Sequence, residues 1–430
     1  MRRSLFVSAL LGTPLLCLPA GGGLAAQDAL CDPDNGGLDL PPGFCARVVA
    51  DSVGRARHLV VTPDGDLLVA LRRGRGNGQS GGLLALRDND GDGRADVMER
   101  FGESSATGIA LRDGFIYFAA DDAILRYPYR PGTLGPAGPP DTIVAALPSE
   151  RSHAAKSAAL DADGNLFVNV GSPSNACQVE DRVAGAPGQD PCPELATRAG
   201  IWRFDAGRTD QAQADGERYA TGLRHTFALA IAPWGDLYGV QHGRDQLHQN
   251  WPELFTEEQG AYKPSEELVR IERGDDFGWP YCYHDPQLNR RVLAPEYGGD
   301  GEAGGRCTGM KEPAFAFPAH WAPEAILFYT ADQFPERYRG GAFISFHGSW
   351  NRDPLPQEGY NVVFLPFENG RPVATYEVFA DGFAGPDVSP RGARHRPTGL
   401  AVGPDGALYL ADDKGGRIWR ILFVGSRRFM

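Results

Sequence analysis

The chain has 430 residues, 42% hydrophobic side chains and a formal net charge of −13. This length and hydrophobic content allow one large domain or two ordinary ones with a substantial core, and the acidic balance argues against a general binder of nucleic acids or anionic membranes. The 56 glycines and 34 prolines suit many short strands joined by turns and argue against long helices.

The N-terminus has the pattern of a secretory signal. Arg2-Arg3 precede an apolar run over residues 5–18, and small residues follow it. The run is too short to span a bilayer comfortably. We therefore expect residues 1–26 to be a signal peptide, residues 27–430 to form the mature protein without a membrane span, and the location to be periplasmic or secreted.

A phrase close to Pro-Asp-Gly-x-Leu-x-Val recurs along the chain. Its copies lie at residues 62–69, 113–117, 163–168, 234–238, 339–344 and 404–410. Asp-Gly supplies the positive backbone dihedrals of a tight hairpin turn, and the alternating apolar residues after it indicate a half-buried strand. Six such units predict an all-β fold, a six-bladed β-propeller of four-stranded antiparallel sheets. We expect it to span residues 41–423, with residues 40–50 adding a ring-closing strand beside the last blade.

Residues 88–99 have the ligand spacing of an EF-hand-type loop. Asp88, Asp90, Asp92, Asp96 and Glu99 stand at positions 1, 3, 5, 9 and 12, with Gly at position 6. The flanks look like strands, so the sequence predicts either a hairpin stapled by a structural Ca²⁺ ion or an acidic turn without an ion.

Three long loops are expected over residues 174–198, 248–267 and 285–312, the second with a short helix. Such loops either carry binding residues or only cap the blades. Beyond the signal segment the chain has six cysteines, which implies disulfides in an exported protein. Six cysteines allow fifteen pairings. We expect pairing of nearest neighbours (Cys31–Cys45, Cys177–Cys192 and Cys282–Cys307), because each pair would then staple one local loop.

Seven longer phrases carry a resemblance to a known family. They are Ser152-His153, Ser172-Pro173-Ser174-Asn175, Gly222-Leu223-Arg224-His225, Gln241-His242-Gly243-Arg244-Asp245, Gly278-Trp279-Pro280-Tyr281-Cys282-Tyr283, His347-Gly348-Ser349-Trp350-Asn351-Arg352 and Arg394-His395-Arg396-Pro397-Thr398-Gly399. Together they resemble the soluble sugar dehydrogenases that use pyrroloquinoline quinone (PQQ), especially the sorbosone dehydrogenase-like branch. The resemblance covers nearly the whole mature chain and implies a six-bladed propeller that holds PQQ and Ca²⁺ over its channel.

The resemblance also implies catalytic roles. His153, just before a predicted strand over residues 160–170, matches the family's general base, and a neutral imidazole suits that task near neutral pH. Arg224 matches the arginine that stabilises negative charge on the reacting quinone oxygen. The glucose-oxidising members place carboxylates where this chain has Ser152 and Ser172.

Cofactor and metal ligands follow in the same way. Arg394 and Arg396 match a pair that binds the cofactor's carboxylates, for which guanidinium groups are suited. His225, His347 and Arg352 are further cofactor-binding candidates, and the backbone carbonyls of Gly243 and Arg244 match the Ca²⁺ ligands.

The expected partners are a sugar or polyol substrate and an external electron acceptor, a cytochrome or a quinone. Two alternatives remain open: a Ca²⁺-dependent propeller hydrolase of the lactonase type, and a non-catalytic binding propeller. The cluster of Arg224, Arg394 and Arg396 favours the quinoprotein, because a lactonase site needs no such set of cations for a triacid.

Overall fold

The computed structural model describes residues 30–74, 80–150 and 152–425. The predicted signal peptide, residues 1–26, lies outside these ranges. Among the described residues, no helix is long and apolar enough to cross a membrane.

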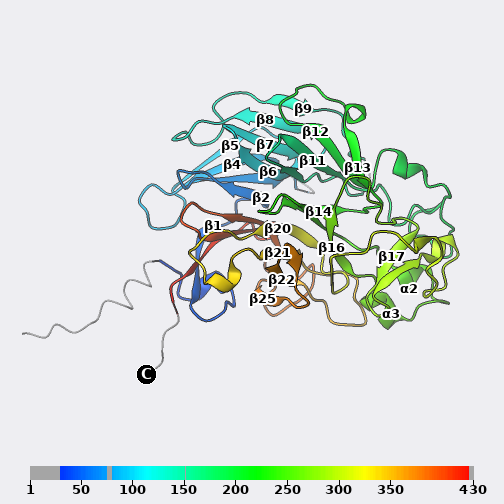
Figure 1. Ribbon diagram of the computed structural model, residues 1–430. Helices are drawn as coiled ribbons and strands as arrows, with labels where there is room; N and C mark the ends of the chain where they lie inside the picture. Colours follow the sequence, from blue (N-terminus) through cyan, green and yellow to red (C-terminus); the bar gives the residue numbers. More distant parts are fainter. Residues whose placement is uncertain (1–29, 75–79, 151, 426–430) are drawn as a thin grey trace, which may run out of the picture.

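Six four-stranded antiparallel sheets form a β-propeller, as the repeats predicted (Figure 1). Blade 1 consists of β2 (Arg55–Val61), β3 (Leu67–Arg72), β4 (Gly82–Arg87) and β5 (Val97–Phe101). Blade 2 consists of β6 (Ala106–Arg112), β7 (Phe115–Ala120), β8 (Ile124–Pro128) and β9 (Asp141–Val144). Blade 3 consists of β10 (Ala158–Leu160), β11 (Asn165–Val170), β12 (Gly200–Asp205) and β13 (Glu217–Thr221). Blade 4 consists of β14 (Thr226–Ile231), β15 (Leu237–Gln241), β16 (Glu266–Ile271) and β19 (Phe315–Phe317). Blade 5 consists of β20 (Pro323–Phe328), β21 (Ala342–His347), β22 (Tyr360–Leu365) and β25 (Glu377–Ala380). Blade 6 consists of β26 (Pro397–Val402), β27 (Leu408–Asp412), β28 (Ile418–Phe423) and the N-terminal strand β1 (Phe44–Ala50).

The repeated phrase marks the same place in every blade, the connection between the first and second strands. There the glycine takes a positive φ, for example 93° at Gly65, 82° at Gly164 and 80° at Gly406, a conformation that side chains with a Cβ rarely adopt. The first strands β2, β6, β10, β14, β20 and β26 contact their neighbours around the ring and line its axis. The predicted single strand over residues 160–170 is instead β10 and β11, because one of these turns interrupts it.

The predicted ring closure is confirmed by β1, which pairs with β28 as the outer strand of blade 6. Phe44 of β1 also packs edge-on against Phe334 and Phe379 of blade 5, with ring centroids 4.8 and 5.0 Å apart. Buried aromatic packing thus supplements the backbone hydrogen bonds that join the N-terminal strand to the last blade.

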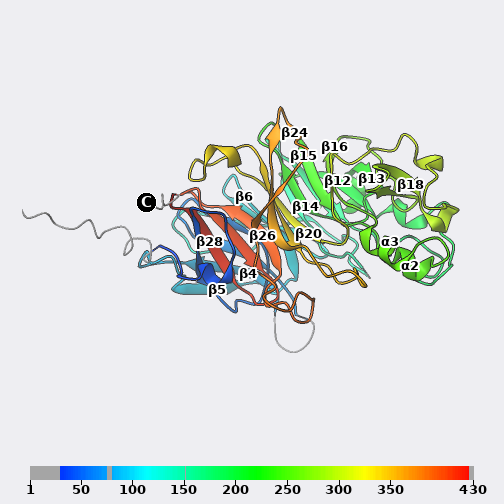
Figure 2. The same ribbon diagram turned by 90° about the horizontal axis from the view of Figure 1, so that it is seen from below.

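Two of the long loops contain regular structure. The helix predicted in residues 248–267 is two short ones, α2 (Leu247–Asn250) and α3 (Glu257–Tyr262). The hairpin β17 (Cys282–Asp285) and β18 (Arg290–Leu293) extends into residues 285–312, for which no strand was predicted. Figure 2 shows α2, α3 and β18 together beside blade 4.

A second hairpin, β23 (Phe367–Glu368) and β24 (Arg371–Pro372), follows β22. Short 3₁₀ helices lie at Asn35–Gly37, Pro193–Ala196, Gln213–Asp215, Pro295–Tyr297, Gly305–Cys307 and Glu336–Tyr338.

Candidate active site

One end of the propeller axis collects most of the charged and imidazole side chains that the sequence motifs contain. In an antiparallel blade, the start of the first strand and the end of the second lie at the same end of the sheet. Most of the strand ends that this rule brings together have a charged side chain, an imidazole or Ser172 at the end itself or a few residues from it. The residues are Arg55, Arg57, Arg72, His153, Ser172, Arg224, His225, His242, Glu324, His347, Arg396 and Asp413.

Three histidines from blades 3 and 4 lie in a row, of which the first two are stacked and the third is tilted. The rings of His153 and His225 are nearly parallel, with centroids 4.7 Å apart, and His242 lies 5.1 Å beyond His225. Burial lowers the pKa of all three, and the nearby Arg224 lowers it further. For His242 the pKa falls to about 3, so these rings are neutral at physiological pH.

The orientation of His153 is set by Ser172. Its Nδ1 lies 2.8 Å from the Ser172 carbonyl oxygen and 3.1 Å from Ser172 Oγ. Ser172 Oγ donates its proton to the Ser174 carbonyl, at 2.7 Å, so both Ser172 oxygens accept from the imidazole. His153 therefore carries its proton on Nδ1, which leaves the Nε2 lone pair free to accept one.

Arg224 is buried and held from several sides. Its Nε donates to the Asn175 carbonyl at 3.2 Å, one terminal nitrogen to the Gly243 carbonyl at 2.9 Å, and the other to Asn175 Oδ1 and Asp245 Oδ2 at 3.1 and 2.9 Å. Burial lowers the pKa of Arg224, but the Asp245 carboxylate favours its charge. Of the five N–H groups of a guanidinium, these contacts use four.

A second charged network joins blades 1, 5 and 6. Arg57 bridges Asp413, at 2.7 Å, and Glu324. Asp413 also accepts from His347 Nε2 at 2.7 Å and from Arg55 at 3.0 Å. Arg55 and Arg57 were not predicted as site residues. The sequence contains one indication of them: Arg55 and Arg57 are two residues apart on β2, so their side chains lie on the same face of the strand.

Two arginines beside this network have no carboxylate partner among the described residues. Arg396 donates to the carbonyls of His347 and Gly348, at 2.8 and 2.6 Å, and lies over the Tyr360 ring. The Arg72 side chain makes no hydrogen bond or ion pair with any described residue. Burial lowers the pKa of both, which means that each guanidinium has lost water without gaining a neutralising anion.

This donor set fits a planar triacid such as PQQ. Partly buried cations without neighbouring anions favour binding of carboxylates. In addition, His225 Nδ1 and Arg57 Nε are buried without a hydrogen-bond partner in the part of the chain that the structure describes. A ligand with several carboxylate and ring heteroatoms would satisfy such groups.

Two other residues that were predicted to bind the cofactor, Arg394 and Arg352, have surroundings unlike those of Arg396. Arg394 is exposed, and its side chain packs along Gly385. Arg352 is buried; it donates to the Pro356 carbonyl and pairs with Glu358 at 2.9 Å within its own loop, and donates to the Ala319 carbonyl of the preceding loop. These contacts give Arg352 a structural partner set separate from the axial cluster.

The predicted metal carbonyls lie beside Arg224. The Gly243 carbonyl already accepts from Arg224, and its second lone pair remains. The Arg244 side chain points into a different buried ion pair, with Glu296, so only its backbone is left for a metal.

In the acidic loop, ligand oxygens of Asp88, Asp90 and Asp96 lie within 4.8 Å of one another on the surface, without Asp92 or Glu99 in that group. Asp92 Oδ1 instead accepts from the backbone of Arg94 at 2.7 Å, and Glu99 lies within β5.

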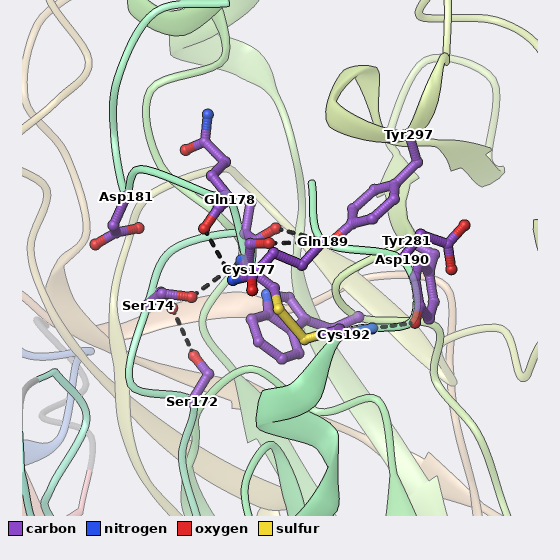
Figure 3. The surroundings of a disulfide bond; sticks show 12 residues. Ser172, Ser174, Cys177, Gln178, Asp181, Gln189, Asp190, Cys192, Tyr281 and Tyr297 are labelled. Carbon is purple, nitrogen blue, oxygen red and sulfur yellow. Dashed lines mark hydrogen bonds between the residues drawn. A yellow bond between two sulfur atoms is a disulfide. The ribbon is translucent and has the colours of Figure 1, made fainter. Parts of the chain in front are cut away.

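All three predicted disulfides are present: Cys31–Cys45, Cys177–Cys192 and Cys282–Cys307. Figure 3 shows the second of them, which lies in the loop of blade 3 that starts at the end of β11, beside Ser172, and leads to β12. The disulfide loop is therefore connected directly to the residue that orients His153.

Comparison with known proteins agrees with this architecture. The TrAA12-like family model matches residues 38–422. An uncharacterized protein of Borreliella burgdorferi is 31% identical over 210 residues, which make up 48% of this chain and 49% of that protein. The match thus spans about half the length of that relative.

Several solved structures share the fold. The calcium structure of Trichoderma reesei Carbohydrate-Active Enzymes Family AA12 has a TM-score of 0.72 at 22% identity and covers 90% of this chain and 97% of that one. The holo form of the pyranose dehydrogenase PQQ domain from Coprinopsis cinerea has a TM-score of 0.70 at 19% identity, with 90% and 97% coverage. The apo soluble aldose sugar dehydrogenase of Escherichia coli has a TM-score of 0.58 at 17% identity, with 88% and 99% coverage. The family match over residues 38–422, on a propeller of this topology, shows that the chain belongs to the TrAA12-like family.

Proposed function

We propose that the protein is a PQQ-dependent dehydrogenase that oxidises a hydroxyl group of a sugar or sugar-derived alcohol or aldehyde. The observation that supports this most is the pairing of two kinds of group at one end of the axis. Arg72 and Arg396 are cations without carboxylate partners among the described residues, and His153 is a neutral base with a free Nε2.

In this proposal, Arg72 and Arg396 bind carboxylates of PQQ, and His225 Nδ1 and Arg57 Nε bind further polar atoms of it. Arg394, His347 and Arg352 were also predicted to bind it. The Arg394 side chain is exposed, whereas Arg352 and His347 form ion pairs with Glu358 and Asp413.

His153 acts as the general base. Its Nε2 accepts the hydroxyl proton of the substrate, and the Ser172 oxygens stabilise the imidazolium through Nδ1–H. PQQ, when bound, would supply the two-electron acceptor for the hydride of the same carbinol carbon, so that the substrate would leave as a carbonyl compound. Arg224 is a fixed cation next to this base and stabilises negative charge that develops during the transfer.

We also propose calcium in two places. Ca²⁺ on the carbonyls of Gly243 and Arg244 would lie beside Arg224 and favour an anionic cofactor. A second ion in the loop of Asp88, Asp90 and Asp96 would be structural.

The electrons would pass to an external cytochrome or quinone. Three disulfides favour an oxidising compartment, so we propose a periplasmic or secreted location.

The decisive experiment is reconstitution. Purified apoprotein is dialysed against PQQ with and without Ca²⁺, and bound PQQ is measured by absorbance. Reduction of an artificial dye is then followed with a panel of aldoses, ketoses and polyols. We expect stoichiometric PQQ binding and dye reduction with a subset of these sugars. Ester hydrolysis with Ca²⁺ alone would point to a hydrolase instead, and neither activity would point to a binding propeller.

Two variants separate binding from chemistry. His153→Ala should lower turnover about 10²–10⁴-fold with the Kd for PQQ unchanged. Arg396→Ala should raise that Kd about 10–100-fold, since a hydrogen bond to a charged group contributes about 1.5–3 kcal/mol. Arg273→Ala, at an exposed arginine paired with Glu217, is the matched control and should change neither. Full activity in both test variants would refute the assignment.

A further inference from the structure

One short segment touches both proposed catalytic groups. Ser172 binds His153 through its carbonyl and hydroxyl oxygens, and its backbone N–H donates to the Arg224 carbonyl at 2.8 Å. Three residues later, Asn175 binds the Arg224 guanidinium through both its backbone carbonyl and its side-chain oxygen. The segment over residues 172–175 therefore positions both His153 and Arg224.

Asn175 is fully buried and uses almost every polar atom it has. Besides Arg224, Oδ1 accepts from the Asp245 backbone at 2.9 Å, and Nδ2 donates to the Asp245 carbonyl at 2.9 Å. Its own carbonyl also accepts from Trp279 Nε1 at 3.0 Å, and its N–H donates to Asp181 Oδ1 at 2.9 Å. A side-chain amide both accepts and donates hydrogen bonds without adding a charge.

The segment from Gly171 to Asn175 is held in place by the loop that the Cys177–Cys192 disulfide closes. The N–H of Cys177 donates to Ser174 Oγ at 3.0 Å, and Cys177 is bonded to Cys192 (Figure 3). Gly171, at the start of the segment, passes so close to His153 that a Cβ there would lie 2.6 Å from the His153 Cβ. The close approach and the covalent closure together leave the segment little freedom to shift.

We propose that Asn175 is a positioning residue for the reaction: it holds the Arg224 guanidinium and the Asp245 backbone in a fixed relation to His153, which the same segment orients through Ser172. This inference rests on the proposed dehydrogenase function. Under this proposal the activity also depends on the buried Asn175 amide, which does not contact His153. The side-chain atoms of Asn175 bind Arg224 and the Asp245 backbone. Misplacement of a catalytic group by about 1 Å is enough to cost about 100-fold in rate.

The test compares Asn175→Ala with Asn175→Asp. Asp keeps an acceptor for Arg224 and loses the donor to Asp245, whereas Ala loses all side-chain contacts. Each protein is reconstituted with PQQ and Ca²⁺, and four quantities are measured: the melting temperature, the Kd for PQQ, the single-turnover rate of cofactor reduction by stopped flow, and the Trp279 indole N–H signal by NMR in ¹⁵N-tryptophan-labelled protein.

We expect Asn175→Ala to lower the single-turnover rate about 10–100-fold, with a change in Kd of less than about threefold and the Trp279 signal in place. Asn175→Asp should recover at least half of that loss on a logarithmic scale, because the contact with Arg224 returns.

Three results would overturn the inference: an unchanged rate in Asn175→Ala, an equal rate loss in both variants, or a loss of rate that appears only together with loss of the Trp279 signal and of PQQ binding. The last result would mean that Asn175 only supports the fold. If the wild-type protein does not bind PQQ, the proposed function itself fails, which the wild-type reconstitution shows separately.

Discussion

Replacement of His58 by Gln should change how the stability of the apoprotein depends on pH. His58 lies on β2, with Nε2 2.8 Å from the Glu324 carbonyl oxygen and its ring edge-on to Phe227. The His225 ring packs against the same Phe227. Burial and, to a smaller extent, the neighbouring Arg57 together lower the pKa of His58 to about 4. Gln offers a donor to the same carbonyl and has no proton to gain.

The sign of the effect follows from linkage. Between pH 6.5 and pH 4 the unfolded chain protonates His58 and the folded protein does not, so the contribution of His58 to the free energy of unfolding is complete above pH 6.5 and is lost as pH falls. For a pKa of about 6.5 unfolded and 4 folded, this loss from pH 7 to pH 5 is about 2 kcal/mol. Because His58 is only partly buried, solvent screening reduces the expected value to about 1–2 kcal/mol.

The assay is urea unfolding at pH 7, 6 and 5 at constant ionic strength, followed by far-UV circular dichroism. We expect the stability difference between wild type and His58→Gln to move by about 1–2 kcal/mol in favour of the variant as pH falls from 7 to 5. His248→Gln, at a histidine on α2 far from the axis, controls for the loss of an imidazole as such. Parallel pH profiles for wild type and His58→Gln would refute the reasoning, and a shift of the opposite sign would mean that the folded protein holds His58 charged.

Three further predictions concern stability and metal binding. Replacing both Cys282 and Cys307 by Ser should lower the free energy of unfolding by about 3.5 kcal/mol, from the loop entropy of a 25-residue separation; a loss below about 1 kcal/mol in urea titrations would contradict this. Ca²⁺ at millimolar concentration should raise the melting temperature of the apoprotein, and Asp90→Ala should remove most of that rise; equal rises would exclude an ion in this loop. Phe44→Ala should cost about 3–5 kcal/mol, because the ring packs against Phe379 across the closure; a two-state transition of unchanged midpoint would mean that β1 adds little to ring closure.

Much of the fold could be predicted because its signals are local. The turn after each first strand needs a residue with positive φ, so Gly65, Gly114, Gly164 and Gly406 record the blade repeat in the sequence itself. Disulfide pairing was also predictable, since each pair closes a loop of 14 to 25 residues.

The second charged network could not be predicted in the same way. Arg57, Glu324 and Asp413 come from three blades and are more than 80 residues apart along the chain. Each stands in a strand or at its end, where an isolated charge usually faces solvent. Only closure of the ring brings the three together, and their motifs carry no spacing that records it.

The same limit applies to the residues around His153. The sequence shows a serine where the glucose-oxidising relatives have a carboxylate, which leaves the orientation of the imidazole undetermined. In the structure both Ser172 oxygens orient the imidazole, and the nearer of them is the backbone carbonyl, which the residue type at position 172 could not have indicated.

The charge balance of the site indicates why a carbonyl suffices. Asp245 and Asp413 neutralise the arginines nearest to them, while Arg72 and Arg396 remain without carboxylates among the described residues. Burial and the nearby Arg224 lower the pKa of His153 in the apoprotein. In the proposed holoenzyme, a bound triacid would bring negative charge to those arginines and so raise the pKa of His153 towards its ordinary value. A carboxylate on Nδ1 would add to that rise and leave the ring partly protonated near neutral pH, whereas the neutral Ser172 carbonyl fixes the tautomer without adding charge. On this argument the cofactor itself, once bound, adjusts the strength of the base.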